Sequence, residues 1–299
     1  MSLAGRRALL IVNARSRQGS TDLAEVRALL ESRGMHLRQV TPGDASGIAE
    51  LIEKHASDVD CIVLGGGDGT LNCAAGALVA SKLPLGILPL GTANDLARTL
   101  GLPVDVRQAA AVIAGGYAKD IDVGCVNSVH FFNAADIGLG TRVTARLDRG
   151  TKSRWGVLAY PRSLLGAWRE NRAFTAQLRC DGRYERLRVI QLKIANGRYY
   201  GGGMSVLEDA AIDDDRLDLL AIRPQSMLSL LRLAPALRAG TVRGNPLIKV
   251  RSGREIDIST RRPMDVSTDG EITTATPAQF SILAGAVKVY VPPPARATD

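Results

Sequence analysis

The sequence predicts an α/β domain, with a parallel sheet and helices on both faces, followed by a mainly antiparallel β-sandwich domain. As far as Asp122, short apolar runs of strand length alternate with helix signals, which is typical of such a parallel sheet. After Asp122, strand-like runs follow one another with few helical stretches between them, which is typical of an antiparallel sandwich. The run that ends at Leu64 leads straight into glycines. The loop from Gly65 should therefore lie at the carboxyl edge of the sheet, where open α/β sheets bind ligands.

The elements of the first domain follow from local signals. Ser20-Thr21-Asp22 can begin a helix and Gly34 can end it. The strands are expected at residues 8–12, 35–40, 61–64 and 85–88, and the helices at residues 20–33, 46–55 and 70–81. The glycine loop would then join the third strand to the third helix.

The pattern changes near Gly124, which is the expected domain boundary. The strands of the second domain are expected at residues 129–134, 174–180, 187–194, 216–222, 255–259, 264–268 and 287–291. Helices are expected only at residues 155–168 and 227–238. The chain would thus consist of a nucleotide-binding domain at residues 1–124, a lipid-substrate domain at residues 125–291 and a disordered tail at residues 292–299.

Composition limits the class of protein. A chain of 299 residues with 45% hydrophobic content can form two modest cores. It has no run of about eighteen apolar residues, so no transmembrane helix is expected. The four cysteines are widely spaced, which favours burial over disulfides or zinc. These features predict a cytoplasmic protein.

The net charge of +8 is unevenly distributed. Between Arg142 and Arg198 there are fourteen Lys or Arg against four Asp or Glu, a local net charge of +10. This segment would suit an anionic partner such as a membrane face, a polyphosphate or a nucleic acid, and a solvated basic surface is the plain alternative. Aromatic residues make up only 4% of the chain, which argues against base stacking and hence against a nucleic-acid partner.

The first chemical motif is Gly65-Gly66-Gly67-Asp68-Gly69-Thr70. Glycines let a backbone approach phosphate closely, and a helix that begins here adds positive potential. Asp68 would repel phosphate unless a cation stands between them, which indicates Mg²⁺. A tight turn is the plain alternative. The motif is neither a dinucleotide fingerprint nor a P-loop, because Thr70 replaces the sixth-position glycine and no Gly-Lys pair occurs in the chain.

The second motif, Pro89-Leu90-Gly91-Thr92-Ala93-Asn94-Asp95-Leu96-Ala97-Arg98, follows the next expected strand. It brings another glycine, a hydroxyl and an Asn-Asp pair to the same edge of the sheet. A simple helix cap is the alternative role for Asn94 or Asp95.

Together these motifs resemble the diacylglycerol kinase catalytic domain, and especially the small soluble bacterial lipid kinases. The resemblance continues, in the family's order, through residues 195–204, Asp213-Asp214-Asp215-Arg216-Leu217-Asp218 and Asp269-Gly270-Glu271. It therefore covers nearly the whole chain.

The resemblance implies a role for each matching residue. The residues expected to bind ATP are Thr41, Gly66, Gly67, Asp68, Gly69, Thr70, Leu71, Asn72, Thr92 and Asn94. The residues expected to organise catalytic Mg²⁺ are Asp68, Asp95 and Asp122. Asp269 would be the general base on the acceptor hydroxyl, with Glu271 beside it. Asp214 and the carbonyls of Ala211 and Arg216 would hold a structural Mg²⁺.

Two positions depart from the family pattern. The family's first loop usually reads Asn-Pro-x-Ser-Gly, but here it is Asn13-Ala14-Arg15-Ser16-Arg17, whose arginines could meet phosphate. The family's structural metal loop usually has glycine where Asp215 stands. The substitution should strain that turn or alter its affinity for the metal.

The expected function is Mg²⁺- and ATP-dependent phosphorylation of a lipid hydroxyl, for example that of diacylglycerol, phosphatidylglycerol or a sphingoid base. A carboxylate base and charge neutralisation agree with the needs of phosphoryl transfer. Two alternatives stay open: an NAD or polyphosphate kinase, which shares Gly-Gly-Asp-Gly-Thr, and a non-catalytic nucleotide- or nucleic-acid-binding protein.

A lipid acceptor implies transient contact with a membrane. The expected helix at residues 155–168 carries Trp155 and Trp168 among arginines, a composition suited to the bilayer interface, although Pro161 interrupts its apolar stripe. Covering the sandwich core is the alternative role for these side chains. The sequence leaves a homodimer open.

Overall fold

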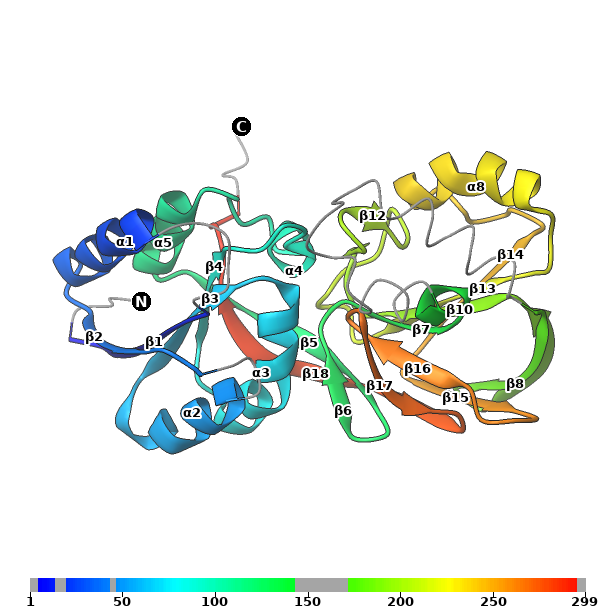
Figure 1. Ribbon diagram of the computed structural model, residues 1–299, viewed down its shortest axis with the longest axis horizontal. Coiled ribbons are helices and arrows are strands. Elements are labelled where there is room, and N and C mark those ends of the chain that lie inside the picture. Colours follow the sequence, from blue (N-terminus) through cyan, green and yellow to red (C-terminus); the bar gives the residue numbers. More distant parts are fainter. Residues whose placement is uncertain (1–4, 14–19, 44–46, 143–171, 295–299) are drawn as a thin grey trace. The chain divides into compact units, whose positions relative to one another are not determined.

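The computed structural model describes residues 5–13, 20–43, 47–142 and 172–294. They form two compact units: one comprises Met1–Asp122 together with Ala284–Asp299, and the other comprises Val123–Leu283. Figure 1 labels the elements of both units. None of the described helices is both long and apolar enough to cross a bilayer.

The first unit is an α/β structure, as predicted. Its strands are β1 (Arg7–Val12), β2 (His36–Val40), β3 (Cys61–Gly66), β4 (Leu85–Pro89) and the first part of β5 (Ala118–Val126). Its helices are α1 (Ser20–Ser32), α2 (Gly47–His55), the short 3₁₀ helix η1 (Ala56–Asp58), α3 (Asp68–Ser81), α4 (Asp95–Thr99) and α5 (Val106–Gly115). The first four strands pair in parallel in the order β2-β1-β3-β4.

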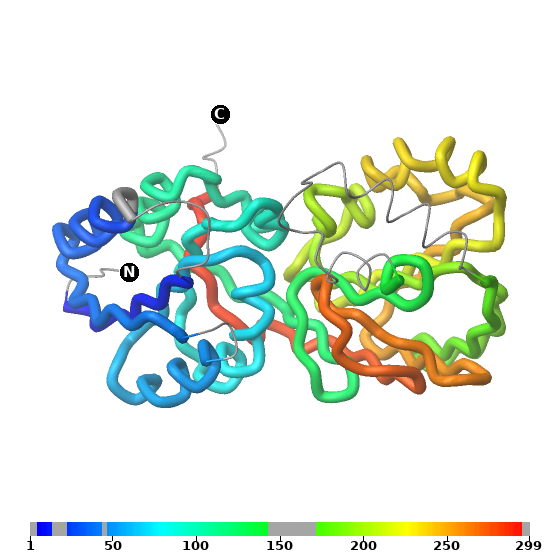
Figure 2. Tube along the Cα trace, viewed as in Figure 1, coloured from blue at the N-terminus to red at the C-terminus, as the bar shows by residue number. Residues whose placement is uncertain are grey.

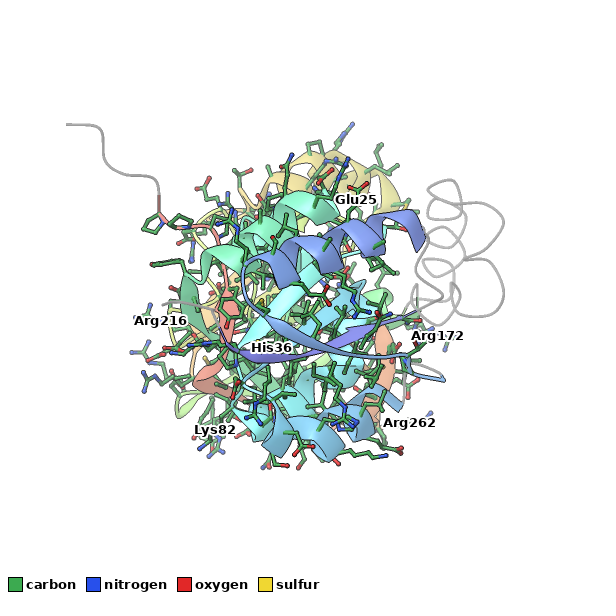
Figure 3. The ribbon with its side chains drawn as sticks, turned by 90° about the vertical axis from the view of Figure 1, so that its left-hand side faces the viewer. Glu25, His36, Lys82, Arg172, Arg216 and Arg262 are labelled. Atoms are coloured by element: carbon green, nitrogen blue, oxygen red, sulfur yellow. The ribbon has the colours of Figure 1, made fainter. Side chains whose placement is uncertain are left out.

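Helices cover both faces of this sheet because the strand side chains alternate between two apolar layers. On one face Leu10 of β1 packs in a buried cluster with Val26 of α1 and Ile113 of α5. On the other side α2 packs against α3. Figure 3 shows Glu25 of α1 and Lys82, just after α3, on opposite sides of the strand that carries His36.

The C-terminal strand β18 (Ala278–Tyr290) belongs to both units, and its last part completes the first one. This part pairs in parallel with β4 through Val289 and Leu85, and in Figure 2 it runs in red beside the cyan strands. The sequence suggested that residues 284–291 belong with the second domain, but the structure places them in the first unit.

The second unit is a β-sandwich, as predicted. One sheet contains β8 (Phe174–Cys180), β9 (Arg183–Val189), β15 (Glu255–Thr260) and the start of β18, with β6 (Val129–Phe131) paired to the end of β5. The other has the order β14 (Ile248–Gly253), β13 (Leu217–Ile222), β10 (Gln191–Ala195), β7 (Ala134–Gly138), β16 (Asp265–Thr268) and β17 (Glu271–Ala275). All pairings within these two sets are antiparallel.

A buried aliphatic layer lies between the two sheets of the sandwich, with Phe131 and Phe280 in edge-to-face contact. The helix α8 (Met227–Ala239) and the small hairpin of β11 (Tyr199–Tyr200) and β12 (Met204–Ser205) pack on the outer face of the β14-to-β17 sheet.

Two expected strands are wrong in their bounds. The stretch 129–134 is two strands, because β6 ends at Phe131 and β7 begins at Ala134 in the other sheet. The stretch 187–194 is likewise two strands, β9 and β10, which meet at Ile190 as the chain crosses from one sheet to the other. Asn133 is the only turn-forming residue at the first crossing, and no glycine, proline or other turn residue marks the second.

Three expectations fall wholly or partly outside the described residues. They are the interfacial helix at residues 155–168, the loop at residues 14–17 and the tail at residues 295–299.

Candidate active site

The glycine motifs lie at one edge of the parallel sheet, as their positions after strands predict. Asn13 follows β1, Thr41 follows β2, Gly67 follows β3 and Gly91 follows β4. Because these strands are parallel, their carboxyl ends share an edge. Most of the residues expected to bind ATP thus come from neighbouring loops of one unit.

The two glycine loops touch each other backbone to backbone. A Cβ atom added at Gly67 would lie 2.9 Å from the Gly91 Cα, and one added at Gly91 would lie 2.5 Å from the Gly67 Cα. A Cβ at Gly66 would clash with the Thr70 side chain at 2.4 Å. These glycines are therefore required by packing, whatever ligand the loops bind.

Asn94 ties the second loop together instead of capping a helix. It stands before α4 in a left-handed conformation, with φ +51°, and makes no side-chain cap bond. Its Oδ1 accepts from the Gly91 N–H at 2.9 Å, and its Nδ2 donates to the Gly91 carbonyl at 2.9 Å. Asn94 thereby fixes the loop that faces Gly67, so the capping alternative does not hold for this residue.

Two carboxylates, Asp68 and Asp95, meet at this edge. Each is the first residue of its helix, α3 and α4 respectively, and Asp95 is only 4% exposed. The Asp68 Oδ1 accepts from the Leu96 N–H at 3.2 Å. Burial, and then the charge of Asp95, raise the pKa of the Asp68 carboxyl above its ordinary value in spite of its backbone donors. A cation between the two carboxylates would relieve this repulsion.

Around this pair, the other expected nucleotide residues differ in exposure. Thr70 is buried and accepts a hydrogen bond from Asn13 Nδ2 at 3.2 Å, whereas Thr92 and Thr41 are exposed. The Oδ1 of Asn72 is buried with no hydrogen-bond partner among the described residues. Such an orphan acceptor is the kind of group that a bound ligand satisfies.

Asp122 lies in β5, 2% exposed, and its Oδ1 accepts from the Gly285 N–H at 2.8 Å. Among the residues that the structure describes, no three His, Cys, Asp or Glu side chains gather as metal ligands. The structure therefore pairs Asp68 with Asp95, and the role of Asp122 toward Mg²⁺ stays a prediction.

In the second unit, Asp269 is held by a group of backbone N–H donors. Its Oδ2 accepts from Phe132 N at 2.8 Å, and its Oδ1 accepts from Asn133 N and Ala134 N, each at 2.9 Å. Its own N–H donates to the Ala134 carbonyl at 2.8 Å. These three donors stabilise the carboxylate as an anion and fix it at the turn between β16 and β17.

The turn itself depends on unusual backbone angles. Asp269 has φ +46° and Gly270 has φ +88°. Asp tolerates the left-handed region better than most residues, so Asp-Gly suits both positions. Glu271 follows as the first residue of β17 and is exposed.

One neighbour of Asp269 was missed from the sequence. Asn133 is 5% exposed, and its Oδ1 has no hydrogen-bond partner among the described residues. Asn196, in the motif at residues 195–204, donates from Nδ2 to the Phe132 carbonyl at 2.9 Å and so anchors the same loop. The only signal for Asn133 was a lone amide in an apolar run.

The expected structural metal loop has its own ties. Asp214 is exposed, and its Oδ1 accepts from Arg216 N at 3.2 Å. Asp215, at φ +58°, occupies the left-handed position that explains the family's glycine, and its carboxylate pairs with Arg254 at 2.5 Å. The turn thus accommodates Asp215, while a metal at Ala211, Asp214 and Arg216 stays a prediction.

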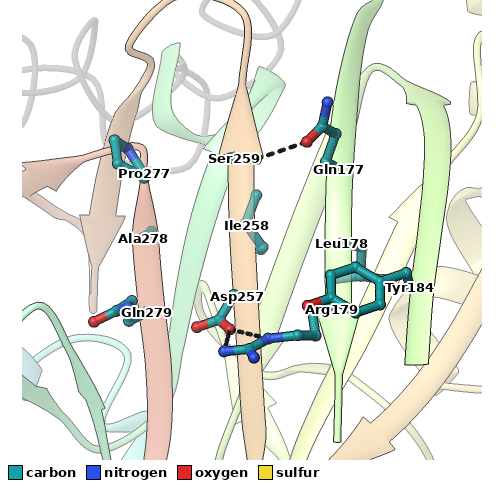
Figure 4. Close-up of a pocket in the computed structure, with 10 residues that line it drawn as sticks. All are labelled: Gln177, Leu178, Arg179, Tyr184, Asp257, Ile258, Ser259, Pro277, Ala278 and Gln279. Carbon is teal, nitrogen blue, oxygen red and sulfur yellow. Dashed lines mark hydrogen bonds and ion pairs between the residues drawn. The ribbon is translucent and has the colours of Figure 1, made fainter. Parts of the chain in front are cut away.

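A surface pocket of about 260 Å³ lies on the outer face of the sandwich sheet that contains β8, β9, β15 and the start of β18. It contains none of the expected site residues. Its floor is polar: Arg179 pairs with Asp257, and Ser259 with Gln177 (Figure 4). These groups satisfy one another, so the pocket does not resemble a catalytic site.

Comparison with known proteins agrees with this arrangement. Residues 7–126 match the diacylglycerol kinase catalytic domain, and residues 133–291 match the YegS C-terminal NAD kinase beta sandwich-like domain. A Pseudomonas fluorescens protein named "Probable lipid kinase YegS-like" is 32% identical over 294 residues, 96% of each chain. A Pseudomonas aeruginosa protein of the same name is 36% identical over 256 residues, covering 84% of this chain and 82% of the relative.

Solved structures share the fold. The crystal structure of a diacylglycerol kinase from Bacillus anthracis str. Sterne has a TM-score of 0.77 at 24% identity, covering 96% of this chain and 97% of that chain. A second crystal structure from that organism, of a protein assigned to the diacylglycerol kinases, has a TM-score of 0.82 at 28% identity, covering 96% of each chain. The chain therefore belongs to the family of YegS-like lipid kinases, which are phosphotransferases with a diacylglycerol kinase catalytic domain and a YegS C-terminal domain.

Proposed function

We propose that this chain transfers the γ-phosphoryl group of ATP to a lipid hydroxyl, in a reaction that requires Mg²⁺. The observation that carries the proposal is the pair of abutting glycine loops with Asp68 and Asp95 at their helix starts. Glycine backbone and helix N-termini favour phosphate, while the paired carboxylates call for a cation. A nucleotide triphosphate with its metal satisfies both.

The donor set fits Mg²⁺. This ion is usually held by one or two carboxylates, with phosphate oxygens and water completing its shell. Asp68 and Asp95 would supply the carboxylates, and Asp122 would act through water. When bound, Mg²⁺ would neutralise the phosphate charge.

Asp269 acts on the acceptor hydroxyl in this proposal. Its anion is held in place by the N–H groups of Phe132, Asn133 and Ala134, so it is positioned to accept a hydrogen bond from the hydroxyl and then its proton. A carboxylate stabilised in this way is a weak base. That suffices where the phosphoryl transition state is loose and little charge develops on the incoming oxygen.

A second acceptor, NAD, has a specific observation in its favour. The matched C-terminal family is described as NAD kinase beta sandwich-like. NAD is therefore included as an acceptor in the test.

The test uses ATP labelled at the γ-phosphate. The acceptors are diacylglycerol, phosphatidylglycerol and a sphingoid base in detergent micelles, together with NAD, each with Mg²⁺ and with a chelator. We expect labelled lipid with Mg²⁺ and none with the chelator. Labelled NADP without labelled lipid would establish the second candidate, and no labelled product from any acceptor would reject both.

Asp269→Asn tests the base. Turnover should fall by about two to four orders of magnitude while ATP binding persists. The new amide also turns an N–H group toward a backbone donor, at a cost of about 1–3 kcal/mol in the free energy of unfolding, so a melting curve must accompany the assay. Glu271→Gln, at an exposed neighbour, is the matched control and should keep its turnover. Equal turnover of Asp269→Asn and wild type would remove Asp269 as the base.

A further inference from the structure

Helix α8 of the second unit presents leucines to solvent. Its inner side chains Leu230 and Leu233 are buried, at 7% and 5% exposure, in apolar clusters under the helix. Leu228 and Leu231, on the other side, are 56% and 55% exposed. Two leucines exposed side by side form an apolar spot that a partner surface could cover.

The stretch of sequence that contains this helix carries charge of one sign. From Leu219 to Arg254 the sequence contains no Asp or Glu and seven basic residues: Arg223, Arg232, Arg238, Arg243, Lys249, Arg251 and Arg254. Four of them form ion pairs with acids elsewhere in the unit: Arg243, Lys249, Arg251 and Arg254. The other three, Arg223, Arg232 and Arg238, are exposed and have no ion-pair partner among the described residues.

The two leucines share one side of the helix with Arg232 and Arg238, and Arg223 lies just before the helix begins. Positions 228, 231, 232, 235 and 238 recur every three or four residues, the spacing that places side chains on the same face. Pro235 has no N–H, so the carbonyl of Leu231 on this face lacks its usual helical donor. A face with exposed leucines, unpaired arginines and a carbonyl that needs a donor suits the headgroup level of a bilayer, where apolar chains and water are both within reach.

We propose that α8 docks this protein on an anionic lipid bilayer, with Leu228 and Leu231 entering the acyl boundary and Arg223, Arg232 and Arg238 meeting lipid phosphates. The charge complementarity between this acid-free stretch and anionic headgroups selects a membrane over other occupants. The surface differs from the interfacial helix expected at residues 155–168.

Docking through α8 would bring the loop at residues 132–134, which holds Asp269, toward the membrane. The cluster beneath the helix includes Ala134 and Ala195. Ala134 N–H is one of the donors to Asp269, and Ala195 precedes Asn196, which anchors the same loop. This step rests on the proposed function, because only a lipid acceptor requires it.

The sandwich sheet that contains β8, β9, β15 and the start of β18 offers a second basic surface for comparison with α8. Arg186 and Arg188 of β9 are also exposed, with no ion-pair partner among the described residues, but they stand on a strand without exposed leucines. They therefore provide two positive charges beside a tyrosine, Tyr184 at 80% exposure, in place of leucines.

Vesicle co-sedimentation tests the proposal with the full chain. The vesicles are phosphatidylcholine alone and phosphatidylcholine mixed with phosphatidylglycerol, at low and high salt. One variant is a triple substitution, Arg223→Gln, Arg232→Gln and Arg238→Gln. The other is a double substitution, Leu228→Ser and Leu231→Ser. The matched controls are Arg186→Gln with Arg188→Gln, and Val104→Ser, which changes an exposed apolar residue elsewhere.

Wild type should bind the anionic vesicles more tightly than the neutral ones, and the more so at low salt. Removal of each of the three arginines should lower the partition coefficient about fivefold, or about 100-fold for all three. The leucine pair should lower it about tenfold. The controls should bind like wild type.

Three results would overturn the proposal: equal binding to both kinds of vesicle, an equal loss in the Arg186 and Arg188 control, or self-association that the leucine pair abolishes, since that would make the face a contact between copies. Activity is measured separately on a short-chain lipid in micelles, where the α8 variants should keep wild-type turnover. Absence of lipid phosphorylation with intact α8-dependent binding would reject the proposed function and leave the docking surface standing.

Discussion

At the scale of single residues, Asp68 shows two opposing influences on one carboxylate. Its place at the start of α3 puts it in the positive potential of a helix N-terminus, which favours the anion. Burial and the neighbouring charge of Asp95 act against the anion and prevail, since the pKa of Asp68 is raised. In the metal-free protein the anionic form of Asp68 is therefore destabilised.

The sign of this effect gives a pH prediction. The folded protein binds the Asp68 proton more tightly than the unfolded chain does. The contribution of Asp68 to the free energy of unfolding is therefore full below the ordinary Asp pKa of about 4, and it is lost as the pH rises through the raised pKa of the folded protein. Asp68→Asn keeps an acceptor for the Leu96 N–H but carries no charge. It should therefore melt at a higher temperature than wild type at neutral pH, and this difference should shrink toward about pH 4.

Activity should move the opposite way. Asp68→Asn is expected to lose two or more orders of magnitude of turnover, about the cost of losing a key charge-stabilising group. Melting curves in metal-free buffer across the pH range, and kinase assays with Mg-ATP, check both parts. A melting difference that is constant with pH would contradict the electrostatic account, and near wild-type turnover would contradict the loop assignment.

The sequence identified Asp68, Asp95 and Asp269 by type and spacing, but their environments needed the fold. The N–H donors that fix Asp269 come from residues 132–134, about 136 positions away in the sequence. Nothing local marks Asn133 as their neighbour. The left-handed conformation of Asn94 was equally hidden, because Asn before a helix reads as an ordinary cap.

At the scale of elements, the loops after β3 and β4 must keep a fixed relative position, because Gly67 and Gly91 leave no room between the two backbones. Neither glycine has a positive φ, so the requirement comes from close approach and not from backbone conformation. The first and second motifs are thus coupled mechanically.

Gly91→Ala tests this coupling. Its Cβ would lie 2.5 Å from the Gly67 Cα and 2.7 Å from the Asn94 Oδ1, so the loops must separate. We expect a loss of about 1–3 kcal/mol in the free energy of unfolding, together with weaker ATP binding. Chemical denaturation and nucleotide titration measure the two effects.

Gly115→Ala is the matched control. Gly115 ends α5 and has nothing within 4 Å of an added Cβ, so alanine there should be neutral or stabilise by up to about 1 kcal/mol. If Gly91→Ala behaves like this control, the contact between the loops does not constrain the site.

Elements with clear punctuation were predictable. Glycine or proline near their ends located β3, β4 and the final helix α8. The break at Ile190 was not predictable, since no glycine, proline or other turn residue separates β9 from β10. Most of β18 was missed for the opposite reason: Gly285, with φ +55°, and several polar residues interrupt a strand that tertiary pairing holds together.

At the scale of the whole molecule, the chain returns to its first unit at the end. Val287, Val289, Tyr290 and Val291 are each at most 5% exposed. The Val291 N–H donates to the Tyr117 carbonyl at 3.0 Å, and Lys288 pairs with Asp120 at 3.1 Å. The antiparallel sandwich could be predicted from the sequence. The pairing of the last strand with the first unit could not, because nothing in the sequence of a C-terminal strand shows which unit it joins.

The return predicts how the first unit folds when isolated. Residues 1–122 alone lack the four buried side chains of the C-terminal segment, each of which contributes about 1.5–3 kcal/mol. The total loss, about 6–12 kcal/mol, is comparable to the whole stability of a typical domain. This fragment should therefore fail to fold cooperatively.

Restoring the strand in cis should rescue the fragment. The Gly285 N–H lies 2.8 Å from the Asp122 carboxylate, so residues 284–299 can be joined to residue 122 through a short Gly-Ser linker without crossing the sheet. We expect the joined fragment to show a single cooperative thermal transition by circular dichroism and to bind Mg-ATP, whereas residues 1–122 show neither. Cooperative melting of residues 1–122 at the same temperature as the joined fragment would mean that the C-terminal strand is dispensable. The first unit would then be complete before the chain enters the sandwich.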